Sequence, residues 1–100
     1  MNLSIVVLTW NDWKNTIDCL QSIIKSNYKN YDVILVDNNS DLKNINFIKK
    51  WQNKEISCNS KFVSPSNQRF KKIIEIKENE IIKQKERGKK NIFLIKNKKN

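Results

Sequence analysis

Three short stretches of the chain are almost continuously apolar and stop abruptly at polar residues. They cover residues 3–9, 31–37 and 91–97, with the sequences LSIVVLT, YDVILVD and NIFLIKN. Each run is short for a helix and rich in β-branched residues, which favours a strand buried on both faces. The pattern therefore predicts three strands of a mainly parallel sheet.

Between the first two runs the apolar residues recur at helical spacing. The stripe consists of Trp13, Ile17, Leu20 and Ile24. Such a stripe predicts an amphipathic helix over residues 12–26, with Asn11 or Asp12 placed to cap its first turn. Strand, helix and strand then form a βαβ unit.

The second half of the chain is less regular. A helix is expected over 41–53, with Ser40 or Asp41 as its cap and Ile45, Ile48 and Trp51 on its inner side. Residues 55–68 hold the single proline and predict a loop. From 70 to 87 the residues favour a helix, with Phe70, Ile73, Ile74 and Ile81 on one side and Gly88 as its C-terminal cap.

The βαβ unit determines where the polar strand ends should lie. Two strands joined by a crossover helix are almost always parallel and right-handed. Thr9-Trp10-Asn11 and Asp37-Asn38-Asn39 are therefore expected side by side at the carboxyl edge of the sheet. In open α/β sheets this is the edge where ligands bind.

The charge of the chain changes this picture little. The net charge is +10, which suggests contact with a phosphate backbone, but 18 of the 20 basic residues are lysine. Specific recognition of nucleic acid relies mainly on the planar fork of arginine. The basic excess also lies in residues 51–100, away from the first two strand ends. We therefore expect no nucleic-acid partner and a solvated, lysine-rich surface.

Several kinds of chemistry are excluded by residue types that the chain lacks. It has one glycine, so no glycine-rich phosphate loop exists, and it has no histidine. Cys19 and Cys58 are too few and too far apart for a disulfide framework or a zinc site. The chain shows neither a signal-peptide pattern nor an apolar run long enough to span a membrane. These features indicate a reduced, cytoplasmic chain.

Two residues at the expected sheet edge suit a nucleoside. Asp37 could accept hydrogen bonds from a base N–H or a ribose hydroxyl, and Trp10 offers a face on which a base could stack. In the competing interpretation Asp37 caps the second helix and Trp10 packs in the core. Residue types alone do not decide between the binding role and the structural role of Asp37 and Trp10.

The first half of the chain resembles a known family more specifically. IVVLTWND, followed by a helix containing CLQSIIKSNYKNYDVILVDNNS, closely resembles the N-terminal segment of family 2 glycosyltransferases with the GT-A fold, particularly the rhamnosyltransferase-like branch. The aromatic-Asn pair at the end of the first strand is matched by Trp10 and Asn11. Asp37 and the polar turn after it match the end of the second strand. The resemblance covers residues 2–53 and returns at 91–100.

This resemblance implies an α/β, three-layer, partial GT-A (Rossmann-like) fold in a single domain, residues 1–100, truncated after the third strand. It implies an inverting transferase, acting in polysaccharide biosynthesis, that uses a nucleotide sugar. Asp37 would contact the base, Trp10 and Thr9 would line the nucleoside pocket, Asn11 would hold the loop, and Asn38 belongs to the same polar turn. Asn97 and Asn100 match an Asn-rich segment of the family.

The departures from the family pattern matter as much as the match. The Asp-x-Asp segment, which holds a divalent Mg or Mn ion on the diphosphate, is not in the sequence, and neither is the carboxylate base. We therefore assign no catalytic and no metal-binding residue, and expect a donor-binding fragment that is inactive by itself. The alternative is a non-enzymatic α/β nucleotide-binding or regulatory module.

The resemblance also implies a strand order in which the second strand lies between the first and the third. The first strand is then an exposed apolar edge, which predicts self-association. The loop and helix expected at about 55–90 form an insertion. Its lysines could rest against anionic lipid, as a peripheral contact at the inner face of the membrane.

Overall fold

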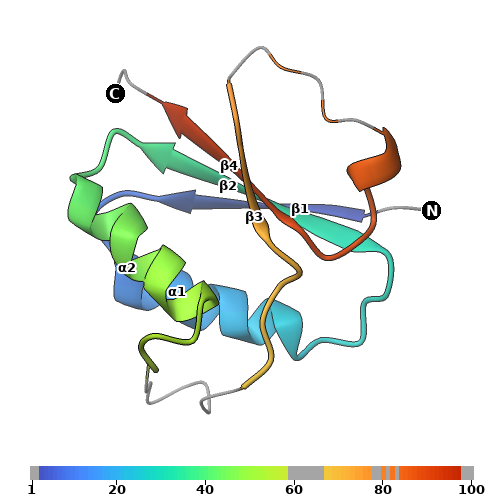
Figure 1. Ribbon diagram of the computed structural model, residues 1–100, viewed down its shortest axis with the longest axis horizontal. Coiled ribbons are helices and arrows are strands. Elements are labelled where there is room, and N and C mark those ends of the chain that lie inside the picture. The colour runs from blue at the N-terminus through green and yellow to red at the C-terminus, as the bar shows by residue number, and fades with distance from the viewer. Residues whose placement is uncertain (1–2, 59–66, 78–79, 81, 83, 98–100) are drawn as a thin grey trace.

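The structure is a computed structural model, which describes residues 3–58, 67–77, 80, 82 and 84–97. Its described residues form an α/β fold with a four-stranded, all-parallel sheet in the order β1-β2-β4-β3 (Figure 1). The strands are β1 (Leu3–Thr9), β2 (Tyr31–Asn38), β3 (Ile73–Ile76) and β4 (Ile92–Asn97), and the helices are α1 (Trp13–Ile24) and α2 (Leu42–Gln52). A short 3-10 turn, η1, covers Gln84–Glu86. The predicted α/β class with a parallel sheet and the central position of the second strand are confirmed, whereas the predicted third layer does not occur among the described residues.

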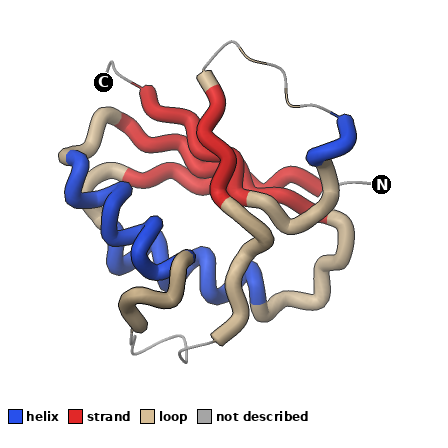
Figure 2. The backbone as a smooth tube through the Cα atoms, in the orientation of Figure 1, coloured by secondary structure: helices blue, strands red, loops and turns tan. Residues whose placement is uncertain are grey.

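Both helices pack on the same face of the sheet, as Figure 2 shows. The predicted stripes provide this contact, because the buried residues of α1 include Ile17, Leu20 and Ile24. On α2, Ile45, Ile48 and Trp51 are buried. Trp13 stacks on Phe47 of α2, with ring centroids 4.3 Å apart. The helices and the sheet face beneath them enclose the core, and no second layer of helices occurs within the described ranges.

The predicted helix over 70–87 is wrong. Residues 73–76 form strand β3, which pairs in parallel with β4, and among the other residues described in this segment only Gln84–Glu86 take a short helical turn. Backbone hydrogen bonds join this segment to β4, from the Lys71 N–H to the Lys90 carbonyl and from the Ile92 N–H to the Lys72 carbonyl. The isoleucines that suggested a helical stripe are β-branched and equally suited to a strand, so pairing with β4 overrides local preference.

A buried carboxylate joins β2 to the segment that leads into β4. Asp32 accepts hydrogen bonds from the backbone N–H groups of Gly88, Lys89 and Asn91. Gly88 has φ of 72°, so it follows η1 in a left-handed conformation instead of capping a long helix. These hydrogen bonds to Asp32 fix the register of β4 against β2, and with it the position of Asn97 beside Asn38.

The predicted loop over 55–68 agrees with the described residues 55–58, 67 and 68, which belong to no helix or strand. Its central part at 59–66, with Pro65, lies outside the described residues. Ile81 of the expected stripe and Asn100 of the Asn-rich match also lie outside them.

Candidate functional site

The carboxyl ends of three strands meet at one edge of the sheet. In the parallel register Thr9 of β1 lies beside Asp37 of β2, and Asn38 of β2 lies beside Asn97 of β4. The loops that follow β1 and β2 begin at this same edge (Figure 1). The structure thus brings together all five predicted binding residues, which are Thr9, Trp10, Asn11, Asp37 and Asn38.

Thr9 is buried and bonded within the protein. The residue is only 3% exposed. Its hydroxyl accepts a hydrogen bond from the Asn44 Nδ2 at 3.0 Å and lies 2.8 Å from the Thr16 hydroxyl. Thr9 therefore connects the end of β1 to both helices. It lines the cavity, but its hydroxyl is already hydrogen bonded within the protein.

Asp37 is also directed inward, with 4% of its surface exposed. One carboxylate oxygen accepts the Ser40 N–H at 3.2 Å, and the other accepts the Asn44 Nδ2 at 3.4 Å. Ser40 directly precedes Asp41, the N-cap residue of α2. Asp37 thus holds the turn that leads into α2, which is close to the capping role of the competing interpretation. It lines a small hollow of about 110 Å³ together with Lys96 and Asn97.

Asn11 joins the two loops to each other. Its backbone N–H donates to the Ser40 hydroxyl at 2.8 Å, and its side-chain Oδ1 accepts the Asp41 N–H at 2.9 Å. Asn11 adopts φ of 46°, a left-handed conformation that asparagine tolerates better than most residues. The loop-holding role that the family resemblance implied for Asn11 is present in this geometry.

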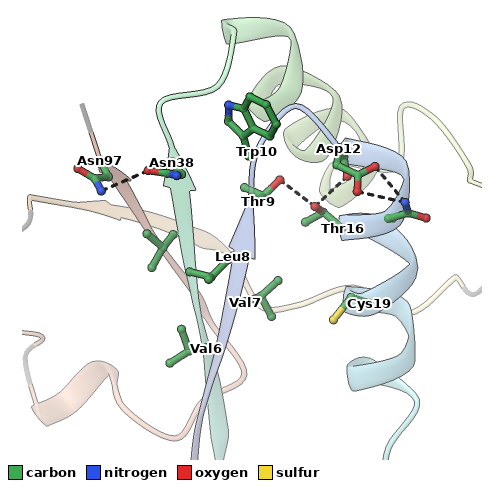
Figure 3. A pocket seen from close by; sticks show the side chains of 12 residues that line it. Val6, Val7, Leu8, Thr9, Trp10, Asp12, Thr16, Cys19, Asn38 and Asn97 are labelled. Atoms are coloured by element: carbon green, nitrogen blue, oxygen red, sulfur yellow. Dashed lines mark hydrogen bonds between the residues drawn. The ribbon is translucent and has the colours of Figure 1, made fainter. Parts of the chain in front are cut away.

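Trp10 is 61% exposed, so the interpretation of this residue as core is wrong. It lines a cavity of about 890 Å³ that extends along β1 (Figure 3). Three aliphatic side chains form the part of the wall on the sheet face away from the helices: Val6, Leu8 and Val36. The amides of Asn38 and Asn97 stand at the strand ends, hydrogen bonded to each other at 3.4 Å. An indole, an aliphatic wall and two amides therefore share one cavity.

Trp10 directly follows β1 and Asp37 is the next-to-last residue of β2, but the two side chains line different hollows. The large cavity contains Trp10 and Asn38, whereas the small one contains Asp37. The acidic residue on the large cavity is Asp12, whose carboxylate accepts the Asn15 amide at 3.1 Å. An aromatic face, apolar contacts and amide hydrogen bonds suit a flat heterocycle with polar edges.

Sequence reasoning missed Asn44, whose amide connects Thr9, Asp37 and Ser40. The available signal was an asparagine directly before Ile45, on the inner side of the second predicted helix. A polar residue at a buried helical position usually has a buried partner.

The described residues do not fit a bound metal ion. Within the described ranges, no group of three or more His, Cys, Asp or Glu side chains is placed to hold one. Among the same residues, no helix is long and apolar enough to cross a membrane.

An open, parallel α/β sheet with a pocket at its carboxyl edge defines a class of domains that bind ligands at the strand ends. Within that class, the family model described as Glycosyl transferase family 2 matches residues 4–100. The chain belongs to glycosyl transferase family 2. No curated protein and no solved structure matches it.

Proposed function

We propose that this chain binds the nucleoside part of a nucleotide-sugar donor and serves as the donor-binding part of an inverting glycosyltransferase. The exposed indole of Trp10 carries the proposal, because it stands over an apolar cavity at the carboxyl edge of the sheet. Stacking on an aromatic face suits any nucleobase. Membership of glycosyl transferase family 2 supports a sugar donor as the source of that base.

In this proposal the remaining site residues have separate roles. Asn38 and Asn97 offer amide groups to the base edge or the ribose from the rim of the cavity. Thr9 and Asn11 hold the two loops in position. Contact between Asp37 and the base stays a prediction, since its carboxylate oxygens already accept hydrogen bonds from the Ser40 N–H and the Asn44 Nδ2.

Sugar transfer also requires stabilisation of the leaving diphosphate and a base for the acceptor hydroxyl. The described residues provide no acidic cluster for a metal ion. We therefore propose donor binding as the contribution of this chain, and we expect binding without turnover when it is assayed by itself.

Substitution of Trp10 tests the proposal. Calorimetric titration with uridine, guanosine and thymidine diphosphates should show binding of at least one of them. Trp10→Ala should weaken that binding by about 1–3 kcal/mol, the usual contribution of one stacked base. Trp10→Phe should retain most of it, because a ring face remains.

Tyr28→Ala is the matched control, since Tyr28 is also an exposed aromatic residue but lies outside the cavity. It should bind as the wild type does. Equal affinity for the wild type and Trp10→Ala would contradict the stacking site, and the absence of binding to all three diphosphates at millimolar concentration would contradict donor binding.

A further inference from the structure

The amino edge of the sheet, which lies opposite the candidate site, carries a group of basic residues. All four strands are parallel, so the segments that lead into them meet at this edge. The Lys71 N–H donates to the Lys90 carbonyl, and the Lys90 N–H donates to the Tyr31 carbonyl, each at 2.8 Å. We call six basic residues of the segments that lead into β2, β3 and β4 the basic edge: Lys29, Lys71, Lys72, Arg87, Lys89 and Lys90.

Little negative charge offsets the basic edge. Five of its six residues are exposed, and the sixth, Lys90, extends over the ring of Tyr31. Among the described residues beside it, Asp32 is buried and accepts three backbone N–H groups, and Glu86 lies 3.8 Å from Lys72. Burial of ammonium groups without acidic partners is costly. The basic edge therefore favours contact with water or with an anionic partner.

The carboxyl edge of the sheet differs in charge. Its described residues include the acidic Asp12, Asp37 and Asp41 and the basic Lys77 and Lys96. The strands begin and end at opposite sides of the molecule, so positive charge is concentrated away from the candidate site (Figure 1). An uneven charge distribution of this kind orients a protein near a charged surface.

A hollow beside the basic edge has side chains that suit a phosphate group. It has a volume of about 340 Å³ and lies between the end of α2 and the start of β3, where Lys71 and Lys72 line it together with Lys49. Glu75 also lines the hollow, but its carboxylate is paired with Lys49 at 2.6 Å. Ammonium groups donate charge-assisted hydrogen bonds to phosphate oxygens. The hollow therefore offers a place for one phosphate head group at the rim of the basic edge.

The residue types of the basic edge favour a lipid surface over nucleic acid. Five of its six residues are lysine, whereas specific recognition of nucleic acid relies mainly on arginine. Attraction to an anionic bilayer requires only positive charge near the surface. Tyr28, next to Lys29, is 54% exposed, and an aromatic ring with a polar tip suits the boundary between lipid and water.

We propose that the basic edge docks this chain on the surface of a membrane that contains anionic lipids. Docking in this way directs the carboxyl edge, with Trp10, away from the bilayer, so the cavity stays open to a donor. The contact is made by three segments that the sheet brings together, whereas the sequence suggested a lysine-rich helix. The proposal goes beyond donor binding and does not depend on it.

Flotation with lipid vesicles at low ionic strength tests the proposal. The wild-type chain should float with vesicles of phosphatidylcholine and phosphatidylglycerol and should not float with phosphatidylcholine alone. High salt should release it, because screening weakens the attraction between exposed charges. Lys71→Glu combined with Lys89→Glu should lower the partition coefficient at least about 30-fold, since each basic residue near an anionic surface contributes a factor of about five.

Lys14→Glu combined with Lys43→Glu is the matched control. It changes the net charge by the same amount, on two exposed lysines in the first turns of α1 and α2, near the carboxyl edge. This double variant should bind vesicles nearly as the wild type does. Circular dichroism of both double variants verifies that the fold is retained.

A second measurement reports the orientation on the bilayer. In a Cys19→Ser background, a polarity-sensitive fluorophore is attached through Asn30→Cys, beside the basic edge, or through Leu42→Cys, at the start of α2. Cys58 is buried. Neither attachment site alters a charged residue. On anionic vesicles the emission of the label at position 30 should shift to the blue, and that of the label at position 42 should stay unchanged.

Four results would overturn the proposal. One is the absence of binding to anionic vesicles at low salt. Another is equal loss of binding in the two double variants, which would assign the binding to net charge alone. The third is a blue shift at position 42 and not at position 30. The fourth is tighter binding to an RNA oligonucleotide than to anionic vesicles at the same salt, lost in the Lys71→Glu and Lys89→Glu double variant, which would assign the basic edge to nucleic acid.

Discussion

Asn44 of α2 donates its side-chain amide to the hydroxyl of Thr9 at the end of β1, with 3.0 Å between the two atoms. The same amide lies within hydrogen-bond distance of Asp37 and Ser40. One buried residue of a helix therefore holds together the two strand ends on which the site is built. The arrangement makes the geometry of the site depend on the packing of α2.

Removal of this amide should destabilise the protein measurably. Asn44→Ala leaves the buried Thr9 and Asp37 oxygens with fewer partners, which typically costs about 1–3 kcal/mol. The Asn44 Oδ1 has no partner within the described residues, so its loss partly offsets that cost. Urea unfolding of Asn44→Ala should show the lower midpoint. Asn46→Ala, an exposed asparagine on the same helix, should unfold at the wild-type midpoint.

Substitution of Asn11 should destabilise the protein in two ways, through the backbone conformation at this position and through the loss of the side-chain acceptor. Asn11→Ala removes the acceptor of the Asp41 N–H and places alanine at φ of 46°, and each effect costs about 1–2 kcal/mol. Asn11→Asp keeps an acceptor and should lose less. Thermal unfolding measures the series.

Asn39→Ala separates the two effects at Asn11. Asn39 also has a positive φ, of 58°, but it is exposed and does not join the two loops. Its substitution should therefore show the cost of the backbone conformation without the loss of a loop contact. If Asn11→Ala is no more destabilising than Asn39→Ala, the link between the loops contributes nothing to stability.

Glu75 should make a small contribution to stability that depends on pH. The hydrogen bond from Lys49, helped by the charges of Lys49 and Lys96, holds the pKa of Glu75 below its ordinary value of 4.5, and burial opposes this effect. A lowered pKa in the folded state stabilises the protein above pH 4.5, and the stabilisation disappears as the pH falls through the folded-state value.

The measurement for Glu75 is urea unfolding at pH 6 and at pH 3. The Glu75 side chain is half exposed, so water and salt screen the pair, and the expected contribution is below about 1 kcal/mol. Glu75→Gln should reduce the difference in stability between the two pH values, and high salt should do the same in the wild type. Glu55→Gln, at an exposed position, is the control. An unchanged difference in Glu75→Gln would argue against the ion pair.

The sequence by itself determined the α/β class, β1, β2 and β4, and the inner faces of both helices. These elements have strong patterns: the three strands are continuous apolar runs, and the helical stripes end in Ile24 and Trp51, which are both buried. The βαβ rule then placed Thr9 and Asp37 at one edge, as the register confirms. Local patterns of this strength are seldom overridden.

Only the tertiary structure decided the rest. The segment at Ile73–Ile76 is rich in isoleucine and fits a helix or a strand, and the unpaired side of β4 made it a strand. Asp37 lies beside Thr9 in the register, where Asn44 and Ser40 hold it inside the protein, whereas Trp10, the residue directly after β1, lies in the open cavity. Exposure depends on partners from distant parts of the chain, and a local pattern carries no information about those partners.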